Sequence, residues 1–174
     1  MIDNMGLYQG KRKDNGEWVE GCGIIETENW VSIFTVNDDI DENSSEVNEI
    51  EVLPETVRRC TEITDKNCVD IYVGDIVKIA DFQIGQVVFE CGAFGIAVMP
   101  YIDWNYLDSE IAEYTGCDNR PLFCYNDNFI SFWELMWNYN QEEEDNCCVV
   151  EVIGNIHENP ELLKGGTNEQ KTDN

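Results

Sequence analysis

The sequence has few positively charged residues. Its 174 residues include 10 lysines and arginines against 36 aspartates and glutamates, which gives a formal net charge of −26. Such a chain repels phosphates and anionic lipid headgroups, so direct binding to nucleic acid or to an anionic membrane surface is excluded. Hydrophobic residues make up 43% of the chain, enough to form a core and to exclude a wholly disordered protein.

Long apolar runs are also missing. No run approaches the roughly 18 residues that a transmembrane helix needs, and residues 1–5 lack the basic and apolar segments of a signal peptide. We therefore expect a soluble, cytoplasmic protein. The chain has eight cysteines, and without an export signal these are expected to be reduced thiols rather than disulfides.

The motifs of the common enzyme classes are absent as well. The sequence contains no G-x-S-x-G, P-loop or H-E-x-x-H pattern. Its single histidine, His157, leaves general-base chemistry to carboxylates or thiols. No C-x-x-C pair is present, so a zinc site would have to gather scattered thiols, and we interpret the cysteines as small apolar residues. We expect no catalytic residue, metal or cofactor, and predict that the protein is not an enzyme.

Turn residues and alternating apolar residues predict a mainly β fold with a helical insertion. Three short strands at 73–79, 85–90 and 94–99, separated by turns, indicate an SH3-like β-barrel or a strongly bent sheet. Helical spacing occurs at 103–115, and Ser131 with Glu134 forms a capping-box pattern that predicts a second helix to about residue 140. The predicted strands lie within residues 5–36, 49–57, 70–100 and 147–157, and the first hairpin is expected to turn at residues 14–16.

A single domain is predicted over residues 1–163. Its β core comprises residues 5–100 and 147–157, and its helical, acidic insertion spans 101–146. Residues 164–174 are predicted to be a disordered tail. The acidic stretches 37–49 and 141–146 are predicted to be solvated loops.

Four stretches together resemble the YopX family of phage and prophage proteins. They are residues 8–21 (YQGKRKDNGEWVEG), residues 64–67 (TDKN) leading to 71–77 (IYVGDIV), residues 85–96, and residues 151–163 (EVIGNIHENPELL). Two departures stand out, because the family has Thr-Gly where this chain has Thr61-Glu62 and Asn-Gly where it has Asn67-Cys68. The resemblance implies a mainly β fold with an SH3-like barrel and a helical insertion, in a protein made by a bacteriophage inside its bacterial host. It implies no activity and transfers no catalytic site.

The acidic residues are concentrated toward the C-terminal half. From Ile79 to Leu163, sixteen acids are opposed by Arg120 alone. One interpretation is a solubility device, with the neighbouring aromatic rings forming the core of a helical lobe. The other is a binding surface that imitates nucleic acid, because self-repulsion of this size is more than solubility requires.

We therefore expect an anti-defence interaction protein that binds and blocks a basic host or phage protein. The acidic binding residues predicted first are Asp108, Glu110, Glu113, Glu142, Glu143, Glu144 and Asp145. Aromatic residues near them are candidate anchors: Tyr101, Trp104, Tyr106, Tyr114, Tyr125, Phe129, Trp133, Trp137 and Tyr139.

A different hypothesis is an oligomeric sponge that sequesters a nucleotide immune signal. Phosphates would require cations and bases would require aromatic rings. The clustered candidates for such an anionic ligand are Lys11, Arg12, Lys13, Arg58 and Arg59, with Trp18 and Trp30 near them in sequence. The run from Lys11 to Lys13 equally suits a solvated hairpin edge that resists strand pairing.

Overall fold

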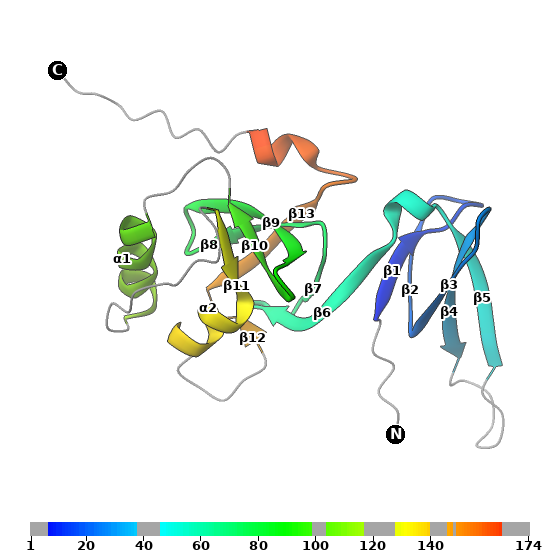
Figure 1. Ribbon diagram of the computed structural model, residues 1–174, viewed down its shortest axis with the longest axis horizontal. Coiled ribbons are helices and arrows are strands. Elements are labelled where there is room, and N and C mark those ends of the chain that lie inside the picture. The colour runs from blue at the N-terminus through cyan, green and yellow to red at the C-terminus, as the bar shows by residue number, and fades with distance from the viewer. Residues whose placement is uncertain are drawn as a thin grey trace. The chain divides into compact units, whose positions relative to one another are not determined.

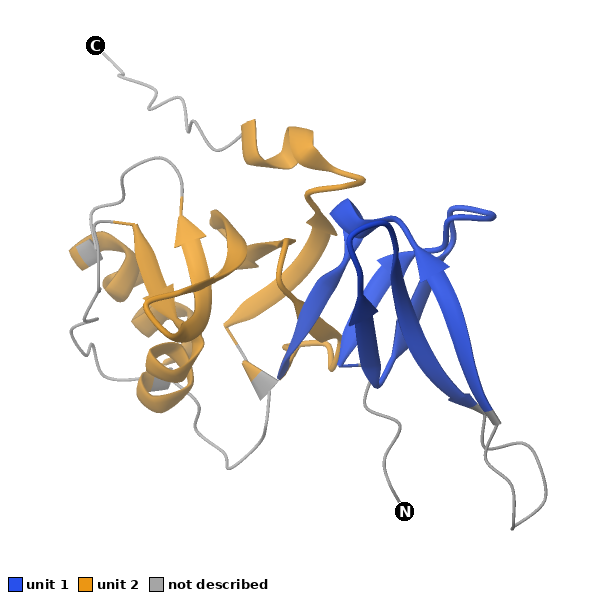
Figure 2. Cartoon of the chain, turned by 45° about the vertical axis from the view of Figure 1, so that its right-hand side comes forward, with its two compact units in different colours: residues 1–62 blue, residues 63–174 orange. Residues whose placement is uncertain are grey.

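The computed structural model describes residues 7–37, 46–98, 104–116, 128–139, 146–147 and 149–164. The chain divides into two compact units, residues 1–62 and 63–174, coloured separately in Figure 2. The single domain expected over residues 1–163 stays a prediction. In the described part of the chain, no helix is both long and apolar enough to span a membrane.

Unit 1 is made of antiparallel strands, shown in blue to cyan in Figure 1. A hairpin forms where the sequence predicts one, but its turn is longer than a tight Asn-Gly turn. The Arg12 N–H donates to the Glu17 carbonyl at 2.8 Å, which leaves four residues in the loop, and of Asn15 and Gly16 only Gly16 has a positive φ, +76°. The elements are β1 (Tyr8–Lys11), β2 (Trp18–Gly21), β3 (Gly23–Glu26), β4 (Val31–Asn37), β5 (Glu46–Val52) and η1 (Pro54–Thr56).

The core of unit 1 is small and centres on Val31, Ile33 and Val52. Strands β3, β4 and β5 form one sheet, and the β1–β2 hairpin joins β5 through a bridge between Arg12 and Val52. Gly21 is required where β2 approaches β4, because a Cβ there would lie 2.0 Å from the Phe34 carbonyl oxygen. The predicted loop 37–49 is too long, since residues 46–49 already belong to β5; residues 38–45 lie outside the described residues.

Unit 2 contains a five-stranded antiparallel sheet in the order β11-β10-β9-β8-β13. The strands predicted near 73–79, 85–90 and 94–99 are confirmed, and so is the mainly β class, whereas the strand predicted within 147–157 is divided into two short strands. The SH3-like barrel is not confirmed, because in the described residues no sheet closes on itself. The strands are β7 (Asp70–Tyr72), β8 (Asp75–Ile79), β9 (Gln83–Glu90), β10 (Ala93–Val98), β11 (Phe129–Ser131), β12 (Asn146–Cys147) and β13 (Val150–Asn155).

Strand β6 (Arg58–Asp65) crosses the boundary between the two units. Its first residues pair with β1, and Thr64 and Asp65 pair in parallel with β12. Glu62 lies between these two pairings with a φ of +62°. The sequence patterns predicted neither β6 nor β11.

Two helices and a final 3-10 turn complete unit 2: α1 (Trp104–Thr115), α2 (Phe132–Tyr139) and η2 (Pro160–Lys164). Both predicted helices are confirmed. The Glu134 N–H donates to Ser131 Oγ at 3.2 Å, which is the predicted cap of α2. Residues 140–145 and the tail from residue 165 lie outside the described residues.

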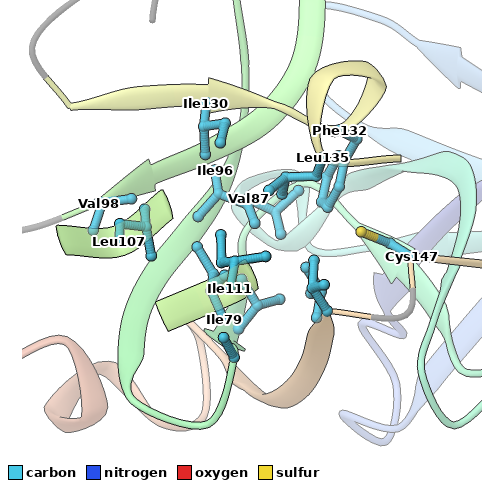
Figure 3. Packing of buried hydrophobic residues seen from close by; sticks show 14 of the residues in the cluster. Ile79, Val87, Ile96, Val98, Leu107, Ile111, Ile130, Phe132, Leu135 and Cys147 are labelled. Atoms are coloured by element: carbon cyan, nitrogen blue, oxygen red, sulfur yellow. The ribbon is translucent and has the colours of Figure 1, made fainter. Parts of the chain in front are cut away.

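Both helices contribute to the main core of unit 2. Figure 3 shows Leu107 and Ile111 of α1 and Phe132 and Leu135 of α2 among aliphatic side chains of the sheet, such as Ile96. Each fully buried side chain of this kind contributes about 1.5–3 kcal/mol to folding. This packing fixes which face of each helix remains at the surface.

Candidate functional site

The helices α1 and α2 carry most of the exposed aromatic surface. Among the side chains that the structure describes, five aromatic ones are strongly exposed, and four of them, Tyr106, Tyr114, Trp133 and Trp137, lie on these two helices. The segments 104–116 and 128–139 include four acids and neither lysine nor arginine. The two helices therefore combine exposed aromatic rings with charge of one sign.

On α2 the exposed rings form a stacked pair. Phe132 and Leu135 face the core, so the side chains of Trp133 and Trp137, four residues apart, share the opposite face. Their exposed fractions are 67% and 69%. The indole centroids are 5.5 Å apart and the ring planes differ by 11°. The pair therefore presents a flat apolar surface to solvent.

On α1 the exposed rings are held by neighbouring groups. Tyr106 packs edge-on against Phe82, with centroids 5.8 Å apart. A hydrogen bond to Glu110 raises the pKa of Tyr106 above its ordinary value, because that carboxylate favours the neutral phenol. The hydroxyl of Tyr114 accepts a hydrogen bond from Lys66 Nζ, 3.5 Å away. These contacts fix the orientation of both tyrosines.

Lys66 is the centre of a charged network in unit 2. Its Nζ lies 2.8 Å from Glu151 Oε2 and 3.1 Å from Asp81 Oδ1, and 5.9 Å from the centroid of the Tyr114 ring. The hydrogen bond to Glu151 is the main reason that the pKa of Lys66 is raised, despite the opposing effect of burial. Lys66 thereby connects the turn after β6 with β13, the β8–β9 turn and α1. Sequence reasoning missed this residue, which gives no local pattern.

The acidic residues predicted on α1 differ in exposure. Asp108 is buried, at 6% exposed, so its carboxylate is not part of the open surface. Glu113 is exposed and Glu110 is partly exposed. The other predicted residues, Glu142, Glu143, Glu144 and Asp145, lie outside the described residues.

Glu134 is the acid of α2, and it is buried at 6% exposed. Burial raises its pKa to about 7, because the charged form loses its hydration. This carboxyl therefore keeps its proton to a higher pH than an exposed glutamate does.

The predicted aromatic anchors separate into three groups. Tyr106, Tyr114, Trp133 and Trp137 are exposed, whereas Phe129 is fully buried. The side chains of Tyr101, Trp104, Tyr125 and Tyr139 lie outside the described residues. Phe129 starts β11, and its ring lies over Gly95 of β10, where a Cβ would be 2.6 Å from the ring.

Two of the predicted cations lie against Trp18 in unit 1. Arg58 Cζ is 4.6 Å and Lys11 Nζ is 5.3 Å from the indole centroid. Arg58 is buried, and its Nε and Nη2 both donate to Gln9 Oε1, the former at 2.7 Å. These two cations therefore take part in the packing of β1, β2 and β6.

The other predicted cations lie along the same hairpin and on β6. Arg12 pairs with Asp14 at 2.6 Å and Lys13 with Glu51 at 2.5 Å. An open hollow of about 400 Å³ here is lined by Ile50 and by charged residues of both signs: Arg12, Lys13, Asp14, Glu49 and Glu51. Arg59 is exposed and lies opposite Tyr8 of β1.

Metal-ligating side chains are not gathered in the described part of the chain. No group of three or more His, Cys, Asp or Glu residues there is arranged to hold an ion. None of the five described cysteines, Cys22, Cys60, Cys68, Cys91 and Cys147, forms a disulfide. Cys60 and Cys147 are buried, and the other three are exposed.

The geometry defines a class of protein: a mainly β protein, with mostly antiparallel strands and two helices that present aromatic rings and carboxylates. A family model described as YopX protein matches residues 7–164, and the chain belongs to the YopX family. The resemblance found in the sequence is thereby confirmed, and with it a phage-type protein whose family function is unclear.

Comparison with solved structures gives a distant likeness. The crystal structure of protein EF1440 from Enterococcus faecalis is 18% identical, covering 90% of this chain and 96% of its own, with a TM-score of 0.46. No curated protein matches the chain.

Proposed function

We propose that this chain is a non-enzymatic phage accessory protein that binds and blocks a basic host or phage protein through α1 and α2. One observation carries the proposal: both helices expose aromatic rings and contain acids without a single base. Aromatic side chains dominate the energetics of protein interfaces, and a charge of one sign selects the partner. We expect the protein to act in the bacterial cytoplasm, in an anti-defence role.

The carboxylates act in two ways in this proposal. Their field attracts a basic partner over several ångströms, which speeds association and makes it sensitive to salt. The more specific form of the proposal is mimicry of nucleic acid, in which carboxylates such as Glu110 and Glu113 occupy the positions that phosphates would take on that partner. The run from Glu142 to Asp145 would extend the same charge along the sequence.

The cations that a nucleotide sponge would need already have other contacts. Arg12 and Lys13 are paired with carboxylates, and Arg58 is buried against Trp18. A nucleotide phosphate would have to displace these contacts. No described feature of unit 1 favours a phosphate over them.

The test is affinity capture from bacterial lysate, with and without phage infection, at low ionic strength and with a salt-step elution. A double variant, Glu110→Gln with Glu113→Gln, removes two surface charges from α1. The matched control, Glu26→Gln with Glu28→Gln, removes two exposed charges from unit 1. We expect a basic protein to be captured by the wild type and the control, and to be released at lower salt from the α1 variant.

Two results would count against this proposal. Capture of the same protein, released at the same salt by the α1 variant and the control, would show that α1 is not the binding surface. Failure to capture any basic protein from infected or uninfected cells would remove the basic partner altogether. Loss of capture by the Glu142–Asp145 neutralised chain alone would move the site to that run.

A further inference from the structure

The stacked indoles of α2 are more exposed than folding requires. Trp133 and Trp137 are exposed at 67% and 69%, while the core-facing residues of the same helix are buried. A side-chain pair four residues apart on a helix adds only about 0.2–0.5 kcal/mol to helix stability. Two tryptophans held face to face at the surface therefore have little structural purpose, and an external ligand explains them better.

Elsewhere in this chain, aromatic rings are in contact with cationic side chains. Arg58 and Lys11 lie over Trp18, and Lys66 lies over Tyr114, at 4.6, 5.3 and 5.9 Å from the ring centroids. A cation over an indole face is attracted by the negative face of the ring, and indole is the best of the aromatic partners. In the described residues, no lysine or arginine lies over Trp133 or Trp137.

We propose that Trp133 and Trp137 form a platform that receives an arginine side chain from a basic segment of the protein partner. The guanidinium is planar and weakly hydrated, so it stacks on the flat indole pair better than the compact ammonium of lysine does. The absence of bases from the helical segments 104–116 and 128–139 leaves the surrounding charge negative, which favours a cation. This inference rests on the proposed function only in taking the partner to be basic.

Other occupants fit the surface less well. A nucleobase would also stack on indole, but it would bring phosphates toward a chain of net charge −26. A second copy of the chain would bring the same charge and, from α2, no cation. A neutral apolar segment would cover the rings but would make no use of the acids on both helices.

The experiment uses three synthetic peptides with alternating glycine: one with arginine, one with lysine and one with citrulline, the uncharged analogue of arginine. Each is titrated into the full chain by calorimetry. The main variant is Trp133→Leu with Trp137→Leu, which keeps the charge and the apolar character of the surface. The control variant is Phe89→Leu, which alters an aromatic ring of comparable exposure (53%) on β9.

We expect the arginine peptide to bind the wild type several-fold more tightly than the lysine peptide, and the citrulline peptide to bind weakly. The double tryptophan variant should lose about five- to tenfold in affinity for the arginine peptide, whereas Phe89→Leu should bind like the wild type. Circular dichroism of each variant establishes that it has folded. Because the net charge is the same in all three proteins, diffuse electrostatic attraction cancels from the comparison.

Three results would overturn the platform. Equal affinity of the double variant and the wild type for the arginine peptide would show that the indoles take no part. Equal binding of the arginine and citrulline peptides would show that the cation is irrelevant. A wild-type dimer that the double variant abolishes, seen by analytical ultracentrifugation, would assign the indoles to a second copy of the chain.

The two proposals can fail separately. If the tryptophan variant binds the arginine peptide normally but the α1 charge variant loses capture, the proposed function stands and the platform is wrong. If the arginine peptide binds the wild type and loses affinity for the tryptophan variant, but no basic protein is captured from cells, the platform stands and the proposed function fails.

Discussion

Two residues with left-handed backbone make a direct test of how this sequence departs from its family. Glu62 and Cys68 have φ values of +62° and +61°. They occupy the two positions at which the YopX pattern has glycine, which adopts such angles without steric cost. We predict that Glu62→Gly and Cys68→Gly each stabilise the fold, although glycine usually destabilises a structured segment.

The local geometry explains why a positive φ is needed at each site. The Cys68 N–H donates to the Asp65 carbonyl at 3.0 Å, and the Asp65 N–H donates to the Val69 carbonyl at 2.8 Å. This is a three-residue hairpin loop that ends in a left-handed residue, the position that glycine favours. Glu62 lies in β6 between the residues that pair with β1 and those that pair with β12.

The expected gain in folding stability is the difference between two opposing contributions. A residue with a Cβ pays about 1–2 kcal/mol in the left-handed region. Glycine loses about 0.5–1 kcal/mol more conformational entropy on folding than alanine does. Each substitution should therefore raise the free energy of unfolding by about 0.5–1 kcal/mol, and the double variant by the sum if the sites are independent. The increase is measured by urea unfolding, with fluorescence and circular dichroism followed together because the chain has two compact units.

Alanine variants separate backbone strain from side-chain effects. Glu62→Ala removes the charge and Cys68→Ala removes the thiol, but both keep the Cβ, so neither should be more stable than the wild type. In a chain of net charge −26, loss of a carboxylate could itself be favourable. If Glu62→Ala were as stabilising as Glu62→Gly, charge relief would be the cause and the reasoning from φ would be refuted.

Three further predictions concern buried or paired charges. Asp65 accepts the N–H groups of Asn67, Val69 and Val152 at 2.7–3.0 Å, so Asp65→Ala should lower the free energy of unfolding by about 2–4 kcal/mol; a loss below 1 kcal/mol in urea would contradict this. Removing the Lys66 ammonium with Lys66→Met should speed amide exchange in α1 while leaving the sheet protected, because Lys66 contacts Tyr114 of that helix; unchanged exchange in α1 would show that this contact does not stabilise the helix. Burial raises the pKa of Glu134 from an ordinary value of 4.5 to about 7, so its contribution favours folding fully below pH 4.5 and is lost as the pH rises through 7. Between pH 5 and pH 8 the wild type should lose about 2 kcal/mol more stability than Glu134→Gln, measured by urea unfolding at both pH values, and parallel pH profiles would refute the shift.

Local rules predicted the elements that local interactions form. The start of α2 follows from Ser131 and Glu134, whose bond lies within one turn of helix. The strands β8, β9 and β10 follow from turns at short, regular spacing. The same helical periodicity that puts Phe132 and Leu135 in the core puts Trp133 and Trp137 at the surface. That part of the candidate site could be predicted before the structure.

Interactions between distant residues were beyond such rules. Strand β6 is held by β1, about fifty positions earlier, and by β12, about eighty positions later, and its own residues include charges and the left-handed Glu62. Asp108 was predicted to be at the surface as an acid, but it adjoins Leu107 on the buried side of α1. A count of acidic residues gives the charge of a chain and does not give the exposure of any one carboxylate.

The structure also bears on whether the acidity serves only solubility. Solubility requires charge on the surface and gives no reason for exposed aromatic rings beside it. The described ion pairs are formed by the first hairpin and by the Lys66 network, and none of them joins two helical residues. The described cations in these pairs hold strands and turns, whereas the segments 104–116 and 128–139 contain acids and no base, and α2 exposes the stacked indole pair. A surface built in this way lacks a cation, which a basic partner would supply.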